Sequence, residues 1–268
     1  MLQDSATISG YLVELFETPG DDVIADDALG REELHQSLEN IIRGFGRGAR
    51  AFLVPPVGRT PVIEFQLTRD DAPALIENRS GFNSIALSDR KEPAELDFNE
   101  ERHDVVLSQL VKHPLVRTIR PPVQIGLADD NTPTSNSGSV NIPSPSPGGN
   151  YPIIGVIDSG VSDILSEWLV GRFDFLDTDE YNAEHGTKVG GLIAAGQTMN
   201  PANVVLEPTG CMLYDAALFP KGRFVDTYAN GFTDFMEEVE QAVIEAKEEH
   251  SVRTVSYTHL TLPTILLV

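Results

Sequence analysis

The feature that most constrains the fold of this chain is a short apolar run that ends on a carboxylate. Residues 152–157 read Pro-Ile-Ile-Gly-Val-Ile, and Asp158, Ser159 and Gly160 follow directly. An unbroken run of branched residues stopped by a turn sequence is typical of a buried strand in a parallel sheet. Open α/β sheets bind their ligands beyond the carboxyl ends of such strands. The run therefore predicts an α/β fold in which Asp158 lies at the functional edge of the sheet.

A second motif supplies a candidate base. His185, Gly186 and Thr187 are followed, after Lys188, by a stretch of small and apolar residues, 189–196. This pattern predicts a helix that begins at or just after His185 and packs closely against a sheet. An imidazole near a carboxylate on a strand tip has the geometry of a general base with its orienting group, because the carboxylate fixes the tautomer and stabilises the imidazolium. Asp158 and His185 are therefore the candidate catalytic residues.

Each motif alone has an ordinary structural explanation, and the pair in this order is more specific. A lone Asp after a strand is often a turn residue or a helix cap, and a lone His before Gly-Thr is often a capping or core residue. Together the two blocks resemble those of the subtilisin-like serine peptidases, the subtilases, in which a hydrophobic strand ends in Asp-Ser/Thr-Gly and His-Gly-Thr opens a small-residue helix. Lys188 and Gly190 depart from the residues common in the family, where a second His and an Ala are usual.

The resemblance implies a parallel-sheet subtilisin-like catalytic domain and a serine-type endopeptidase that hydrolyses peptide bonds with an Asp-His-Ser triad. In such an enzyme His185 takes the proton of the nucleophilic serine, and Asp158 orients His185 and stabilises its charged form. The partner implied is a protein or peptide substrate. Subtilases often bind calcium on loops, and an acidic cluster lies between the two motifs, but its spacing matches no defined calcium loop. We expect no cofactor and no metal.

The remaining subtilase motifs are not found in the sequence. We find no Ser-Leu-Gly substrate-binding segment, no Asn in an oxyanion context and no Gly-Thr-Ser-Met-Ala with the nucleophile. We therefore interpret residues 151–255 as the N-terminal part of a catalytic domain and residues 256–268 as a non-native tail. The expectation is a fragment that has no peptidase activity by itself, because covalent catalysis needs the nucleophile.

Two other functions remain open from the sequence alone. The chain is then either a non-catalytic peptidase inhibitor, chaperone-like escort or pseudo-enzyme, or a different α/β hydrolase or nucleotide-binding protein that carries Asp-Ser-Gly. Inhibition of a complete subtilase by residues 1–122 would favour the first. No Gly-rich phosphate loop follows the strand, which argues against nucleotide binding.

Residues 1–122 have the pattern of a small α+β domain. Apolar alternation and helical spacing predict the succession strand, helix, strand, strand, helix, strand of a ferredoxin-like unit. Two segments compete for the second helix, 70–78 and 99–111, and 82–87 is a further strand candidate. The elements expected are strands at 11–16, 51–54, 61–67 and 115–119 and a helix at 31–43. Domains of this build commonly precede subtilase catalytic domains as a propeptide and inhibitor, which the resemblance implies for residues 1–122.

Residues 123–150 are expected to be a linker, and two further elements follow the catalytic motifs. The segment 131–150 is rich in Pro, Ser and Gly, a composition that cannot offset the entropy of ordering the chain. If the protein matures by cleavage, we expect the cut within residues 129–150. Farther along, residues 211–219 predict a strand and residues 232–249 an amphipathic helix with an acidic face.

Charge excludes several classes of partner. The 268 residues carry 41 acidic and 19 basic side chains, a formal net charge of −22. Such a chain is a poor ligand for nucleic acid or for an anionic membrane surface. The single cysteine, Cys211, permits no internal disulfide and lies in an apolar run typical of a packing residue. No signal peptide and no membrane-spanning segment is recognised, so the location is cytoplasmic on the face of it and secreted if the N-terminus is incomplete.

Overall fold

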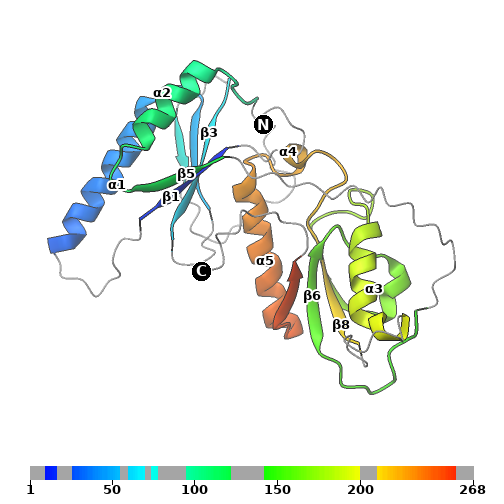
Figure 1. Cartoon of the computed structure of the whole chain (residues 1–268). Coiled ribbons are helices and arrows are strands. Elements are labelled where there is room, and N and C mark those ends of the chain that lie inside the picture. Colours follow the sequence, from blue (N-terminus) through cyan, green and yellow to red (C-terminus); the bar gives the residue numbers. More distant parts are fainter. Residues whose placement is uncertain are drawn as a thin grey trace. The chain divides into compact units, whose positions relative to one another are not determined.

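The computed structural model contains helices and two sheets, one mainly antiparallel and one parallel, so the chain is of mixed α/β class (Figure 1). The chain divides into two compact units. The first comprises residues 1–125, 224–237 and 261–268, and the second comprises residues 126–223 and 238–260. The structure describes residues 10–16, 26–54, 60–69, 74–77, 95–121, 142–199 and 210–257.

The first unit is built on a five-stranded sheet with the order β4-β2-β3-β1-β5. All neighbouring strands are antiparallel except β2 and β4, which are parallel. A helix follows β1, and a second helix precedes β5. The elements are β1 (Tyr11–Leu15), α1 (Asp26–Gly44), β2 (Ala49–Leu53), β3 (Val62–Leu67), β4 (Leu75–Glu77), α2 (Glu100–Leu110) and β5 (Val116–Arg120).

Alternation along the strands gives the sheet of this unit one apolar face. On β3, Phe65 and Leu67 join a buried cluster that also holds Leu38 of α1 and Val106 of α2. Glu64 and Gln66 alternate with them and point to the opposite face, as successive strand residues must. Both helices therefore cover the same face of the sheet, and burial of their apolar side chains is the main force that holds them there.

One expected helix is a strand. Residues Leu75–Glu77 form β4 and pair with Arg50–Phe52 of β2, so the helix predicted at 70–78 is wrong over the part that the structure describes. The open edge of β2 offers backbone hydrogen bonds that a three-residue segment satisfies by adding a strand. The second helical position is filled by α2, the other segment expected to be helical. The strand expected at 82–87 lies outside the described residues.

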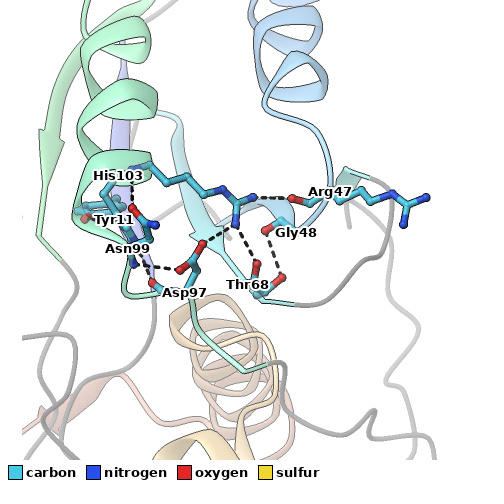
Figure 2. A network of polar contacts seen from close by, with 8 residues as sticks. Tyr11, Arg47, Gly48, Thr68, Asp97, Asn99 and His103 are labelled. Carbon is cyan, nitrogen blue, oxygen red and sulfur yellow. Dashed lines mark hydrogen bonds and ion pairs between the residues drawn. The ribbon is translucent and has the colours of Figure 1, made fainter.

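A polar network fixes the start of α2 to the edge of the sheet (Figure 2). Asn99 caps the helix by accepting a hydrogen bond from the Arg102 amide. The Arg102 guanidinium donates to the Asp97 carboxylate at 2.6 Å and to the Thr68 carbonyl at 3.1 Å. These charge-assisted bonds join α2 to the segment that follows β3 and determine where the helix begins.

His103 and Tyr11 complete this network, and their hydrogen bonds define the histidine tautomer. His103 Nε2 lies 2.7 Å from the Asp97 carbonyl oxygen, which only accepts, so Nε2 carries the proton. Nδ1 then accepts from the Tyr11 hydroxyl at 2.8 Å. Burial, together with the charge of Asp104, raises the pKa of Tyr11, so the hydroxyl keeps its proton as a donor. This Tyr-His pair is accounted for by its structural bonds.

The second unit is built on a parallel sheet with the order β7-β8-β6-β9. Strand β6 pairs with β8 on one side and with β9 on the other, so it is an interior strand of this sheet. The elements are β6 (Ile153–Asp158), the 3-10 helix η2 (Asp163–Trp168), β7 (Leu169–Phe173), α3 (Glu184–Met199), β8 (Met212–Ala217) and β9 (Thr254–Tyr257). Strand β9 includes Ser256 and Tyr257, which were predicted from the sequence to belong to a non-native tail, residues 256–268.

Helices cover both faces of this sheet. On one face α3 packs against β6 and β8, and its Ala194 shares a buried cluster with Val156 and Leu213 (Figure 1). On the other face the Tyr214 hydroxyl donates to Glu245 at 2.7 Å. Glu245 belongs to α5 (Phe232–His250), which begins in the first unit and continues in the second after Glu237. Short helix α4 (Phe224–Thr227) precedes it.

A buried carboxylate caps the start of α5 within the first unit. Glu64 is 0% exposed and accepts hydrogen bonds from the Thr233 amide and hydroxyl, both at 2.7 Å, and from the Phe232 amide at 3.2 Å. Gln66 donates to Glu64 at 3.1 Å and to the Asn230 carbonyl at 2.9 Å. Burial raises the pKa of Glu64 to about 8, although these hydrogen bonds oppose the shift.

Glu64 makes the stability of the first unit depend on pH. Its folded pKa of about 8 lies above the ordinary value of 4.5, so folding takes up a proton between these values. The stability that the protonated form contributes is complete below about pH 4.5 and is lost as the pH rises through 8. Glu64→Gln removes this dependence. We expect the wild-type free energy of unfolding to fall by a few kcal/mol from pH 5 to pH 8 relative to that of the variant, because each pKa unit corresponds to about 1.4 kcal/mol.

The measurement is urea unfolding followed by circular dichroism at several pH values. Glu39→Gln is the matched control, because Glu39 is a partly exposed carboxylate on α1 and its loss leaves the pH dependence in place. Parallel pH profiles for wild type and Glu64→Gln would show that Glu64 stays ionised when buried, contrary to this prediction.

Candidate active site

Asp158 and His185 meet at the carboxyl end of strand β6. His185 Nδ1 lies 2.8 Å from Asp158 Oδ1 and 2.9 Å from Asp158 Oδ2. The Asp158 side chain is 2% exposed, whereas the His185 side chain is 21% exposed. The imidazole thus lies between the buried carboxylate and the surface, which is the arrangement that a base and its orienting group require.

The carboxylate determines which ring nitrogen carries the proton. An ionised carboxylate only accepts hydrogen bonds, so Nδ1–H of His185 donates to Asp158. The lone pair of the neutral ring is then on Nε2, the nitrogen remote from Asp158. A histidine held in this tautomer takes a proton at Nε2, and the imidazolium that forms is stabilised by the negative charge behind it.

The turn after β6 is joined by hydrogen bonds to the first turn of α3. The Ser159 amide donates to Asp158 Oδ1 at 2.7 Å, and the Gly186 amide donates to Ser159 Oγ at 3.3 Å. The Ser162 amide donates to Thr187 Oγ1 at 2.9 Å. The residues on either side of Asp158 and His185 thus hold the strand tip and the helix start at a fixed separation.

Two glycines permit the close approach of these segments. Gly160 has a φ of +88°, a left-handed conformation that other residues rarely adopt, and a Cβ there would lie 2.4 Å from the Tyr181 ring. A Cβ on Gly186 would lie 2.2 Å from the Gly160 carbonyl oxygen. The Gly in Asp-Ser-Gly and the Gly in His-Gly-Thr therefore have a common reason: together they let His185 reach Asp158.

A second buried carboxylate lies on the same face of the sheet. Asp215 of β8 is 0% exposed, and its Oδ2 accepts from Arg172 Nε at 2.9 Å and from the Val161 amide at 3.0 Å. Burial raises the pKa of Asp215 to about 6, the charge of Asp158 adds to this shift, and Arg172 and the Val161 amide oppose it. No sequence motif indicated a role for Asp215 or Arg172. The signal that could have found them is an Asp within the apolar run 213–219, because a buried charge needs a partner.

The other residues singled out in the sequence lie outside this pair. Lys188 forms a partly exposed ion pair with Glu184 at 3.1 Å, one helical turn away. Cys211 is buried beside β8. Among the described residues, no three His, Cys, Asp or Glu side chains are placed to hold a metal ion; the acidic cluster between the motifs consists of Asp174, Asp177, Asp179 and Glu180.

The comparisons with known proteins leave the site to be judged on its geometry. The chain matches no protein-family model, no curated protein and no solved structure. No helix in the part of the chain that the structure describes is both long enough and apolar enough to cross a membrane.

The contact between Gly186 and Gly160 predicts an unusual response to alanine. An interior helical Gly→Ala change normally stabilises a helix by up to about 1 kcal/mol. Gly186→Ala is instead expected to destabilise the second unit by about 1–3 kcal/mol, because its Cβ meets a backbone carbonyl that cannot move away freely. Urea unfolding followed by the fluorescence of Trp168, a buried residue of this unit, measures the effect.

Gly190→Ala is the matched control on the same helix. Its Cβ would meet the ends of the Leu165 and Leu213 side chains at 3.1 Å, and these side chains can adjust. We expect its stability to stay within about 1 kcal/mol of wild type. A Gly186→Ala protein at least as stable as wild type would contradict the proposed close approach.

Proposed function

We propose that this chain carries the base and the orienting carboxylate of a serine-type peptide hydrolase of the subtilisin-like kind. The observation that carries the proposal is the contact of His185 Nδ1 with both oxygens of the buried Asp158 carboxylate, at 2.8 and 2.9 Å. The substrate class is a protein or peptide. The resemblance of the Asp-Ser-Gly and His-Gly-Thr motifs to those of subtilases points to the same chemistry.

In this proposal His185 is the general base. Nε2 accepts the proton of the attacking hydroxyl as its oxygen forms a bond to the substrate carbonyl carbon, and the imidazolium later returns the proton to the leaving amine. Asp158 stays ionised and stabilises the imidazolium. Its low exposure strengthens this interaction, because water screens it little.

The arrangement of the elements supports the same assignment. Asp158 ends β6, an interior strand of the parallel sheet, and open α/β sheets bind ligands beyond the carboxyl ends of such strands. In the first unit, the strand order β2-β3-β1-β5 with a helix in each crossover supports a ferredoxin-like domain for residues 1–122. We propose that this domain is a propeptide-like inhibitor and that residues 151–255 belong to the catalytic domain.

Hydrolysis of p-nitrophenyl acetate tests the base in the chain itself. A general base positioned by a carboxylate accelerates attack on an activated ester, typically by 10²–10⁴-fold when fully aligned. We expect hydrolysis at least about tenfold above the buffer rate, with His185→Ala removing the excess rate and Asp158→Asn removing most of it. Exposed His35 on α1 provides the control, since His35→Ala removes a histidine outside the site. Equal rates for wild type and His185→Ala would refute the role of His185.

Peptide cleavage tests the full proposal in a protein that also carries the nucleophilic serine. With casein as substrate, Asp158→Asn is expected to lower kcat by about 10⁴-fold, because an amide in place of the carboxylate favours the wrong histidine tautomer. Lys188→Ala changes a neighbouring exposed position on α3 and is expected to leave the rate within about twofold. Undiminished casein cleavage by Asp158→Asn would exclude the triad mechanism.

A further inference from the structure

The turn that follows Asp158 is bound by an ion pair between the buried Asp215 carboxylate and the partly exposed Arg172 guanidinium. Val161 is the residue after the Gly160 bend, and both of its backbone polar groups are bound: its amide donates to Asp215 Oδ2 at 3.0 Å, and its carbonyl accepts from Arg172 Nη2 at 2.5 Å. Arg172 Nε in turn donates to Asp215 Oδ2 at 2.9 Å. Two side chains from neighbouring strands thus bind one peptide segment of the turn.

The strand register places Asp215 and Arg172 next to the candidate site. Asp215 of β8 lies opposite Val156 of β6 and opposite Arg172 of β7. Asp158 is two residues beyond Val156, so its side chain points to the same face of the sheet as that of Asp215. Asp215 therefore lies on the same face of the sheet as Asp158, at the level of the residue two positions before Asp158 on β6.

Stability alone does not account for a buried charge here. Asp215 Oδ1 is buried and accepts no hydrogen bond from the described residues, so the carboxylate is only half satisfied. Replacing a buried ion pair by apolar residues of similar volume is often neutral or stabilising. An apolar pair could not form hydrogen bonds with both the amide and the carbonyl of Val161.

We propose that Asp215 is a positioning residue, acting with Arg172 to fix the turn at 159–162 and hence the angle at which Asp158 presents its carboxylate to His185. This inference rests on the proposed function for its catalytic consequence. The structural part stands independently, because the hydrogen bonds from Val161 to Asp215 and from Ser159 to Asp158 lie in the same four-residue segment. Release of Val161 lets the turn adopt more than one conformation, and Asp158 turns with it.

The test measures the His185 tautomer in the intact 268-residue chain. The two ring nitrogens have distinct ¹⁵N chemical shifts in each tautomer, and His185→Ala identifies the signals of this ring. At about pH 8, above the range in which an ordinary histidine titrates, wild type is expected to show Nδ1–H alone. Asp215→Asn keeps the size of the side chain but loses the charge that holds Arg172, and we expect its ring signals to move toward a mixture of the two tautomers.

A matched control separates positioning from loss of stability. Tyr214 is the neighbouring residue on β8, also buried, and its hydroxyl bonds to Glu245 on the opposite face of the sheet. Tyr214→Phe removes a buried hydrogen bond from the same strand without touching the turn, so its His185 signals should match those of wild type. A folded Asp215→Asn protein whose His185 signals are unchanged would overturn the proposal.

Arg172→Lys provides a second variant if Asp215→Asn does not fold. Lysine keeps the positive charge but lacks the planar fork that reaches Asp215 and the Val161 carbonyl together. The same shift of the His185 signals is expected, and its absence in the folded variant counts against the proposal.

Ester hydrolysis distinguishes failure of this inference from failure of the proposed function. If both hold, Asp215→Asn lowers kcat for p-nitrophenyl acetate by about tenfold with KM unchanged, because the base is misaligned while binding is intact. If His185→Ala leaves hydrolysis unchanged, the proposed function fails, and the ¹⁵N measurement still decides whether Asp215 positions Asp158. If hydrolysis depends on His185 but is insensitive to Asp215→Asn, only the inference fails.

Discussion

The structure of the second unit depends on keeping one carboxylate out of water. Asp158 is 2% exposed, and a buried charge is costly unless partners replace the water it has lost. Two of these partners are the Ser159 amide from the turn that follows β6 and His185 from the first turn of α3. These bonds join the turn to the start of the helix, and the close packing of Gly160 against Gly186 permits them.

A second charge on the same face adds to this constraint. Asp215 is buried near Asp158, and two neighbouring negative charges in a dry interior repel each other unless cations or donors lie between them. Arg172 is placed against Asp215 and His185 against Asp158, so each carboxylate has its own cationic or proton-bearing partner. The difference between the partners is chemical. Arginine stays charged at all ordinary pH values, whereas an imidazole gains and loses a proton, so His185 can act as a base and Arg172 cannot.

Sequence patterns predicted the long elements and the central contact better than the short ones. The runs that became β6, β8, α2 and α5 were expected within a few residues, because each is long enough for its apolar pattern to be recognised. Strand β4 has three residues, too few for any period, and its form is set by the free edge of β2. The meeting of Asp158 with His185 followed from two motifs in order. The ion pair of Asp215 and Arg172 could not be predicted in this way. It depends on which strands are neighbours in the sheet, and no local sequence pattern indicates the strand order.

Glu64 and Asp158 are both buried carboxylates near the start of a helix, but their hydrogen-bond donors differ. This difference, and not burial, determines whether the carboxylate can take part in catalysis. Glu64 caps α5 in the first unit and Asp158 meets the start of α3 in the second, and each is almost or fully inaccessible. The donors of Glu64 are the Phe232 and Thr233 amides, the Thr233 hydroxyl and the Gln66 amide, none of which titrates in the physiological range. A proton on Glu64 therefore changes only the stability of the fold. Asp158 instead contacts a titratable ring, His185, that is 21% exposed. A proton that His185 takes up at the surface therefore interacts electrostatically with the buried carboxylate. That coupling of a solvent-facing base to a buried carboxylate is the physical basis for assigning the catalytic role to the edge of β6.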